Sequence, residues 1–198
     1  MPPAPAAGGS ERRPRGATRS LAIVTARDTT RAEARPVTVE GFRRAVGRFA
    51  TGVTVVTAVD GGLDHAMTAN AFTSVSLDPL LVLVCVENEA RFYDAITTAG
   101  AWAVSILDAS ARPAADWLAT RGRPLHGQLD RIPFRRGVTG AAILEQSTAW
   151  LECRTQAVHP GGDHTIVVGE VIALGLGDES NGALLYHRSR YRFLDPPH

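Results

Sequence analysis

The chain has 198 residues, enough for one domain with a terminal segment, and its 44% hydrophobic and 21% charged residues are typical of a globular protein. The formal net charge of +1 gives no whole-molecule signal for a nucleic-acid partner or a membrane surface. All 21 basic residues are arginine, which excludes a lysine Schiff base and the lysine-bearing phosphate loop.

Both cysteines, Cys85 and Cys153, lie in apolar runs typical of strands, and two buried thiols indicate a reducing compartment rather than a disulfide. No run approaches the roughly 20 apolar residues of a membrane span. The apolar stretch over residues 21–26 is too short for the core of a secretory signal. We therefore expect a cytoplasmic protein that does not contact the membrane.

Residues 1–36 are rich in Pro, Ala, Gly, Ser and Arg and show almost no periodic apolar pattern. Such a segment cannot bury enough surface to offset the cost of ordering, so we predict a disordered tail followed by one domain over residues 37–198. The tail holds seven arginines against three acidic residues. A basic arm for an anionic partner is therefore an alternative role for it.

The folded region begins with a predicted helix. Thr38 is a suitable N-cap for a helix over residues 39–50, in which Phe42, Val46 and Phe49 share one face. Three strands are predicted next, over residues 53–59, 65–77 and 80–86. The pair Gly61-Gly62 between the first two strands is typical of a hairpin turn.

The second half of the chain mixes short helices with longer strands. Helices are predicted over residues 89–98 and 114–121, on either side of a strand over residues 102–107. Residues 122–140, rich in Gly, Pro and Arg, are predicted to form a long surface loop. Strands follow over residues 148–158, 164–174 and 184–193, with a turn at residues 160–163 between the first two.

Strands outnumber helices in this order, and several strands are joined by short turns, so the pairing should be antiparallel. We therefore predict a mainly β, α+β fold. About six antiparallel strands would close into a small Greek-key-like barrel with short flanking helices.

Several kinds of chemistry find little support. The segment over residues 175–180 opens like a dinucleotide-binding fingerprint but lacks its third glycine and a following helix, so we interpret it as a loop. Cys153, His159 and His164 have no second cysteine nearby, and we favour ordinary packing over a zinc site. A catalytic triad that uses Asp163 and His164 has no local support. We expect no bound metal.

The segment from Met67 to Pro79 is unusual for a strand, because small and hydroxyl side chains surround Asn70. One interpretation is an edge strand whose Thr and Ser side chains face water. The other is a surface where a flat ring approaches the main chain, whose polar groups, with Asn70 and hydroxyls such as Ser74 and Ser76, hydrogen-bond to it.

Four blocks of sequence resemble the flavin reductase-like domain family: residues 42–57, 67–79, 161–165 and 184–188. The resemblance covers residues 39–194 and extends to the reductase components of two-component flavin-dependent monooxygenases. It implies a homodimeric split barrel that binds FMN or FAD near the dimer interface. It also implies that hydride passes from NADH or NADPH to the flavin, and that a partner monooxygenase receives the reduced flavin.

The resemblance also implies site residues. The flavin ring and ribityl chain would contact Asp64, His65, Ala66, Met67, Thr68, Asn70 and Ala71, with Cys85, Val86 and Glu87 at the end of the next strand. Arg91, followed by Phe92, would face the flavin phosphate, and Trp117 with Leu118 would border an adenine. The nicotinamide nucleotide would meet His164, Tyr186, His187, Arg188 and Ser189. His164 is the one candidate catalytic residue, as a group that orients the nucleotide.

Two positions depart from the family pattern. Leu80 replaces a second proline after Pro79, and Ser189 replaces a common glycine, which adds a Cβ beside the expected nicotinamide site. The residues also leave two other functions open. One is a flavin-dependent oxygenase that retains its flavin, and the other is a flavin-binding module without enzymatic activity.

Overall fold

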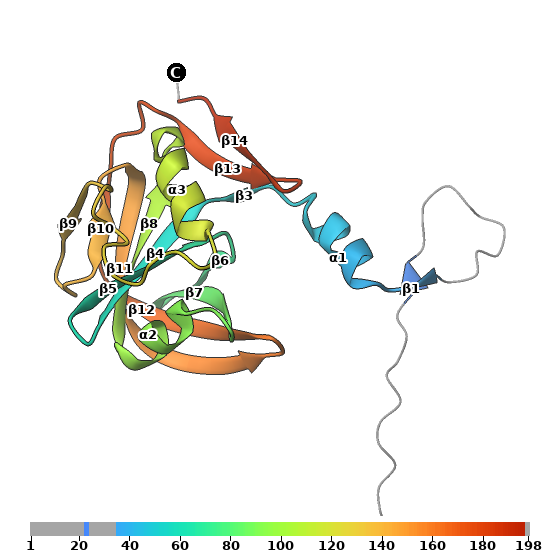
Figure 1. Cartoon of the computed structure of the whole chain (residues 1–198), viewed down its shortest axis with the longest axis horizontal. Coiled ribbons are helices and arrows are strands. Elements are labelled where there is room, and N and C mark those ends of the chain that lie inside the picture. Colours follow the sequence, from blue (N-terminus) through green and yellow to red (C-terminus); the bar gives the residue numbers. More distant parts are fainter. Residues whose placement is uncertain (1–21, 24–34, 197–198) are drawn as a thin grey trace, which may run out of the picture. The chain divides into compact units, whose positions relative to one another are not determined.

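The computed structural model describes residues 22–23 and 35–196 (Figure 1). The chain divides into two compact units, residues 1–46 and 47–198. In the first unit, β1 (Ala22–Ile23) pairs antiparallel with β2 (Arg35–Pro36), and α1 spans Val39–Val46. Most of the predicted tail over residues 1–36 lies outside the described residues.

Helix α1 begins as predicted and ends earlier than predicted. The Thr38 hydroxyl oxygen accepts a hydrogen bond from the Gly41 N–H at 3.0 Å, which confirms the N-cap. The helix ends at Val46 instead of residue 50, because Gly47 follows and glycine is a poor helix former. The side chains of Phe42 and Val46 are exposed.

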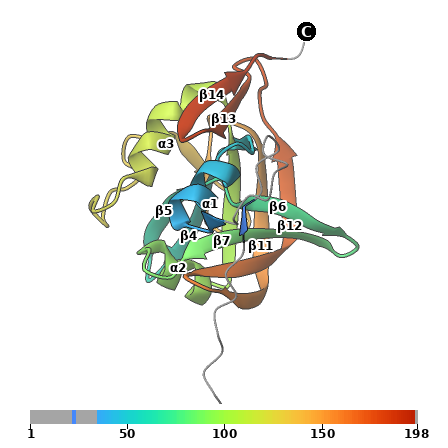
Figure 2. The ribbon, with the colours of Figure 1, turned by 90° about the vertical axis from the view of Figure 1, so that its right-hand side faces the viewer.

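The second unit is built around a seven-stranded antiparallel sheet with the order β5-β4-β8-β11-β12-β7-β6. Its strands are β4 (Thr54–Asp60), β5 (Leu63–Ala69), β6 (Phe72–Leu77), β7 (Leu80–Glu87), β8 (Ala101–Leu107), β11 (Ser147–Gly161) and β12 (His164–Leu176). Buried residues from strands across this sheet meet in one cluster, among them Val56, Val84, Trp102 and Val167. The sheet therefore curls into a barrel, with β5 and β6 as its two edges (Figure 2).

Two helical segments cover the barrel. Helix α2 (Phe92–Thr98) contributes Phe92 and Ile96 to the cluster that contains Trp102. The 3-10 helix η1 (Ala109–Ala111) leads into α3 (Arg112–Ala119), and Leu118 of α3 belongs to a second buried cluster that includes Val55 and Ala66. The two helices thus cover two separate cores.

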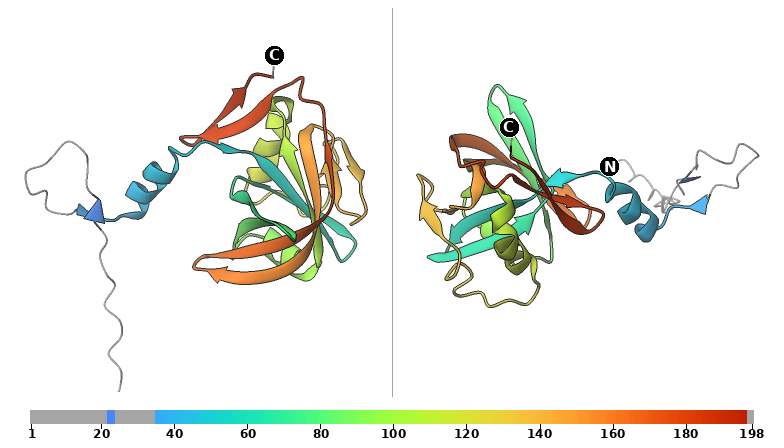
Figure 3. Two further views of the ribbon diagram at one scale, coloured as in Figure 1. Left: turned by 180° about the vertical axis from the view of Figure 1, so that it is seen from behind. Right: turned by 90° about the horizontal axis from the view of Figure 1, so that it is seen from above.

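Short strands complete the unit. The strands β3 (Thr51–Gly52), β13 (Ala183–His187) and β14 (Arg190–Leu194) form a sheet with the order β14-β13-β3, and β9 (Phe134–Arg136) pairs with β10 (Ala142–Leu144). Figure 3 shows the β11–β12 hairpin projecting from the barrel. No helix among the described residues is long and apolar enough to cross a membrane.

The structure corrects three predicted elements. The strand predicted over residues 65–77 is two strands, because the chain breaks at Asn70 and Ala71 and β6 pairs with β7 on the other edge of the sheet. The strand predicted over residues 184–193 is the β13–β14 hairpin, whose turn residues Arg188 and Ser189 have φ angles of 50° and 58°. The predicted loop over residues 122–140 contains β9, whose short length gives little periodic signal.

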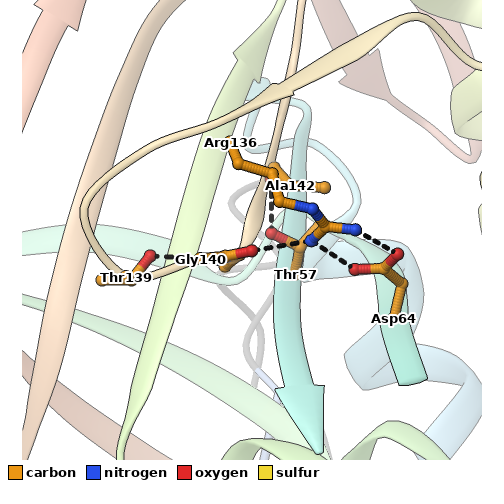
Figure 4. Close-up of polar contacts among 7 residues, drawn as sticks. Thr57, Asp64, Arg136, Thr139, Gly140 and Ala142 are labelled. Atoms are coloured by element: carbon orange, nitrogen blue, oxygen red, sulfur yellow. Dashed lines mark hydrogen bonds and ion pairs between the residues drawn. The ribbon is translucent and has the colours of Figure 1, made fainter. Parts of the chain in front are cut away.

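An ion pair and a hydrogen bond from a buried hydroxyl join the β9–β10 hairpin to the barrel (Figure 4). The Arg136 guanidinium donates two hydrogen bonds to the Asp64 carboxylate, at 2.9 and 2.8 Å. The Thr57 hydroxyl donates to the Ala142 carbonyl at 2.6 Å. These contacts fix the hairpin beside β4 and β5.

Candidate functional site

A cavity of about 560 Å³ opens beside β5 and is bounded by the end of β7, the start of α2 and the segment that follows α3. Eight residues that the sequence assigned to the flavin or its adenine line this cavity: His65, Ala66, Met67, Thr68, Glu87, Arg91, Phe92 and Leu118. Strands and helices far apart in the sequence thus bring half of the residues predicted to contact the flavin together.

The wall formed by β5 presents main-chain groups, because β5 is an edge strand. The carbonyl of Ala66 points away from β4 and accepts a hydrogen bond from the Arg123 guanidinium. The N–H and C=O groups of one residue in an antiparallel strand point to the same side. The N–H groups of Ala66 and Thr68 therefore face the free edge as donors.

Hydrogen bonds join helix α3 to β5 and to the segment that follows α3. The Thr68 hydroxyl donates to the Ala115 carbonyl at 2.8 Å, and the Trp117 indole N–H donates to the Gln128 carbonyl at 2.9 Å. Trp117 is thus turned toward the segment after α3 and does not line the cavity, so its predicted contact with an adenine stays a prediction.

Three arginines dominate the charge of the cavity. Arg121 forms an ion pair with Glu87 at 2.7 Å, whereas the Arg123 guanidinium donates to neutral oxygens of Ala66, Thr120 and Gln128. Burial lowers the pKa of Arg123, and the neighbouring charge of Arg91 lowers that pKa further. The cavity therefore offers positive charge beside a polar strand edge.

His164 lies at the start of β12, directly opposite Glu87 of β7. Its Nδ1 lies 2.8 Å from a carboxylate oxygen of Asp163, and its side chain is about half exposed. Asn88 holds the adjoining turn, because its side chain donates to the Gly162 carbonyl and accepts from the Thr165 hydroxyl. The pairing places His164 next to a residue that lines the cavity.

The β13–β14 hairpin lies at a second cavity, of about 490 Å³, against α3. Tyr186 and Ser189 line it, and Ala119 lines both cavities. His187 ends β13, and the Arg188 N–H donates to the Gly47 carbonyl. Within one chain these residues do not share a cavity with His164, so a common nicotinamide site stays a prediction.

Other predicted residues lie outside the first cavity. The Asp64 carboxylate is paired with Arg136, and the Val86 side chain is buried in the core, so Val86 can offer only main-chain groups.

The Asn70 amide donates to the Thr51 hydroxyl at 3.3 Å. Ala71 lies beside Cys85, whose N–H donates to the Ala71 carbonyl and whose thiol pKa is raised by burial. Ser74 and Ser76 lie on β6.

Sequence reasoning missed the segment after α3. Thr120, Arg121, Gly122, Arg123, Leu125 and Gln128 all line the cavity, as does Glu89 before α2. The arginines of this segment were the available signal, but in sequence they look like the solvated charges of a surface loop. Only the contact between Arg123 and Ala66, 57 positions apart, reveals their role.

Metal binding has no geometric support in the described residues, where no group of three or more His, Cys, Asp and Glu side chains could hold an ion. Cys153 is buried in the barrel core, and burial raises its pKa to about 12. This position agrees with the packing role expected for Cys153.

Comparison with known proteins agrees with the fold. The model of the flavin reductase-like domain family matches residues 46–195. The chain belongs to this family. The expected family and the expected mainly β barrel are therefore confirmed.

Several relatives carry names that describe their activity. The chain is 37% identical over 158 residues to the NADH-dependent FMN reductase AsuE2 of Streptomyces nodosus subsp. asukaensis, covering 79% of this chain and 85% of that protein. It is 42% identical over 157 residues to the NADH-dependent FAD reductase of Streptomyces globisporus, covering 78% and 85%. It spans only 42% of the length of a relative from Rhizobium meliloti (strain 1021) named "Probable flavin reductase", with 42% identity over 133 residues and 67% of this chain covered.

A solved structure shares the same architecture. The crystal structure of BorF, the flavin reductase component of a bacterial two-component tryptophan halogenase, superposes with a TM-score of 0.76 at 42% identity. The match covers 81% of this chain and all of that chain. The barrel and the elements around the cavity therefore belong to a fold that supports flavin reduction in a relative.

Proposed function

We propose that this chain is an NADH-dependent flavin reductase that reduces FMN or FAD and releases the reduced flavin. The observation that carries the proposal is the free edge of β5, which faces a cavity that also presents Arg91 and Arg123. The names of the relatives support the reaction and the use of NADH.

The residues at the cavity fit a flavin. The small side chains of Ala66 and Thr68 let a flat ring approach the strand, whose N–H groups can donate to the polar edge of the ring. The nearly buried apolar side chains of Phe92 and Leu118 lie behind the cavity, and Arg91 and Arg123 offer charge to a phosphate. When bound, the flavin and the dihydronicotinamide supply the redox chemistry themselves.

The protein's own task is then to position groups, and His164 is the side chain we assign to orient the nucleotide. Its pairing opposite Glu87 places it at the border of the cavity, and the Asp163 carboxylate holds its ring through Nδ1. The Nε2 side of the ring is then available to a ligand. No side chain needs to act as a general acid in this scheme.

We also propose a homodimer. Exposed apolar side chains lie on three neighbouring strands, β6, β7 and β12: Val75, Leu77, Leu80, Ile172, Leu174 and Leu176. A monomer rarely exposes so many large apolar side chains together, and a second copy would cover them. Leu174→Arg should give a monomer in light scattering, whereas Val138→Arg, at an exposed position on the β9–β10 turn, should not. A dimer that persists in Leu174→Arg would refute this interface.

The names of the relatives also suggest where the reduced flavin goes. One is the reductase component of 4-hydroxyphenylacetate 3-monooxygenase from Thermus thermophilus. We propose that a flavin-dependent monooxygenase or halogenase receives the reduced flavin from this chain. The free thiols Cys85 and Cys153 suit the reducing cytoplasm, where NADH is available.

Steady-state oxidation of NADH and NADPH, with FMN, FAD and riboflavin offered in turn, tests the proposal. We expect many turnovers of NADH per protein, and only when flavin is added. A yellow chromophore that stays bound without NADH oxidation would indicate a flavin-binding module instead. NADH oxidation that requires a third substrate and retained flavin would indicate an oxygenase.

A further inference from the structure

Residues 121–127, which follow α3 and belong to neither a helix nor a strand, lie along one side of the cavity beside β5. We refer to these seven residues as the strap. Leu118 of α3 precedes the strap and Leu129 follows it, and both side chains belong to the same buried cluster. The strap is therefore fixed to the core at both of its ends.

The main chain between these two ends is weakly held. Within the described part of the chain, no N–H group of residues 121–127 donates a hydrogen bond to another main-chain oxygen. Gly122 and Gly127, near the two ends of the strap, have φ angles of 77° and 70°, which glycine adopts without strain. An exposed segment with few main-chain hydrogen bonds opens at a low cost in free energy, and such glycines suit the hinges of a lid.

Side chains hold the strap against three walls of the cavity. Arg121 forms an ion pair at 2.7 Å with Glu87, the last residue of β7. The Arg123 guanidinium donates to the Ala66 carbonyl on β5, and the Arg91 guanidinium, just before α2, donates to the Arg123 carbonyl. In this structure the strap is therefore closed, and every one of these contacts uses a side chain.

The contacts differ in what they cover and in how easily they break. Arg123 occupies a carbonyl on the free edge of β5, where the proposed function places the flavin ring, so the ring has to enter and leave while the strap is open. The side chain of Arg121 is 81% exposed and that of Glu87 is 34% exposed. An exposed ion pair is weak and is screened by salt, so this contact can break and form again readily.

We propose that the strap is a lid that bends at Gly122 and Gly127, and that the ion pair between Arg121 and Glu87 is the latch that keeps it closed. This inference rests on the proposed function. A reductase that releases reduced flavin exchanges its flavin in every turnover, and the lid controls the rate of that exchange. The latch acts in the flavin-free and the flavin-bound protein alike, so breaking it raises the open fraction of both. Association and dissociation of flavin then accelerate together, and the affinity stays nearly constant.

The experiment measures the association and dissociation rates of riboflavin by stopped-flow fluorescence. Riboflavin is the probe because it has the flavin ring but no phosphate, so salt does not act on its charge. Arg121→Gln should raise both rates by about two- to fivefold, the factor that an exposed ion pair supplies, and should change the dissociation constant by less than about twofold. The control Arg131→Ala, which removes an exposed arginine outside the cavity, should match the parent protein.

Exchanging the two charges tests the pair itself. Arg121→Glu places two carboxylates together and should raise both rates at least as far as Arg121→Gln. Adding Glu87→Arg restores an ion pair of opposite orientation and should bring both rates back toward those of the parent. Rates that stay high in this double variant would show that Arg121 does not act through Glu87, and would overturn the latch.

Salt and hydrogen exchange give two further readouts. Sodium chloride should accelerate both rates in the parent protein, because it screens the ion pair, and should leave them unchanged in Arg121→Gln. In the flavin-free protein, the amides of the strap should exchange faster in Arg121→Gln than in the parent, whereas those of β4 should not change. Faster dissociation without faster association would make Arg121 a contact to the flavin, and unchanged rates would show that the strap does not control exchange. Either result would overturn the proposal.

The lid and the proposed function fail differently. If riboflavin does not bind and NADH is not oxidised, the flavin reductase function fails, while faster amide exchange in Arg121→Gln still identifies the latch. If NADH oxidation with flavin proceeds but neither the riboflavin rates nor the amide exchange of the strap respond to Arg121→Gln, the function stands and the lid is wrong.

Discussion

Replacing Glu152 by glutamine should destabilise the fold without touching the cavity. Glu152 is 1% exposed, and its carboxylate accepts hydrogen bonds from the Thr139 N–H at 2.7 Å, the Thr139 hydroxyl at 2.6 Å and the Val138 N–H at 3.0 Å. These bonds hold the turn of the β9–β10 hairpin. In glutamine, an NH₂ group replaces one carboxylate oxygen. This NH₂ group would face the Val138 N–H, so that the Val138 N–H loses its hydrogen-bond acceptor.

The size of the effect follows from the hydrogen bonds. A hydrogen bond to a charged group contributes about 1.5–3 kcal/mol, so we expect a loss of roughly 2–3 kcal/mol in the free energy of unfolding. For a chain of this length that corresponds to about 4–12 °C in melting temperature. Urea denaturation at pH 7 measures the loss, with Glu145→Gln, a change at an exposed position, as the control.

The same substitution has a pH dependence with a defined sign. Burial raises the pKa of Glu152, but the hydrogen bonds from Thr139 and Val138, with the charge of Arg135, outweigh burial and leave that pKa below its usual value. The carboxylate therefore stabilises the fold above about pH 4.3, the usual pKa of glutamate, and this contribution is lost as the pH falls through the lowered pKa. The difference between parent and variant should shrink in acid. A difference that is absent at pH 7, or that grows in acid, would refute this account.

Three further predictions concern the site and the core. His164→Ala should raise the KM for NADH and leave flavin affinity unchanged. A fall in flavin affinity with an unchanged KM for NADH would show that His164 contacts the flavin and not the nicotinamide nucleotide. Asp64→Asn should cost about 1 kcal/mol and leave flavin affinity within about threefold, because the partly exposed carboxylate pairs with the more exposed Arg136; a large loss in flavin titrations would return Asp64 to the flavin site. Gly169→Ala should cost about 1–3 kcal/mol in denaturant unfolding, because its Cβ would collide with Trp102 and lie 2.8 Å from the Cys153 Cβ, whereas Gly52→Ala should be neutral. Equal stability of the two glycine variants would contradict this packing.

The predictions that succeeded rest on local chemistry. The Gly61-Gly62 turn joins β4 to β5 with φ angles of 56° and 77°, which glycine adopts without strain, and Thr38 caps its helix within three residues. Of the small-residue segment from Met67 to Pro79, only Met67 and Thr68 line the cavity, and its role in binding flavin stays a prediction.

The predictions that failed concern two strands that each proved to be two shorter strands. Residue types suited to a strand continue on both sides of Asn70, so local propensity does not show that β5 and β6 occupy opposite edges of one sheet. Likewise, the positive φ angles of Arg188 and Ser189 make a hairpin turn from two residues that rarely adopt that conformation.

By itself, the sequence determined the antiparallel barrel, because turns, caps and the alternation of side chains act over a few residues, and its four blocks of resemblance determined the family. The tertiary structure alone decided which charges meet. Arg123 reaches Ala66 across 57 positions and Arg136 reaches Asp64 across 72, and such pairs form only after the barrel has closed. Arg136 is then paired with a carboxylate and Arg123 with neutral oxygens, although in sequence both look like loop residues.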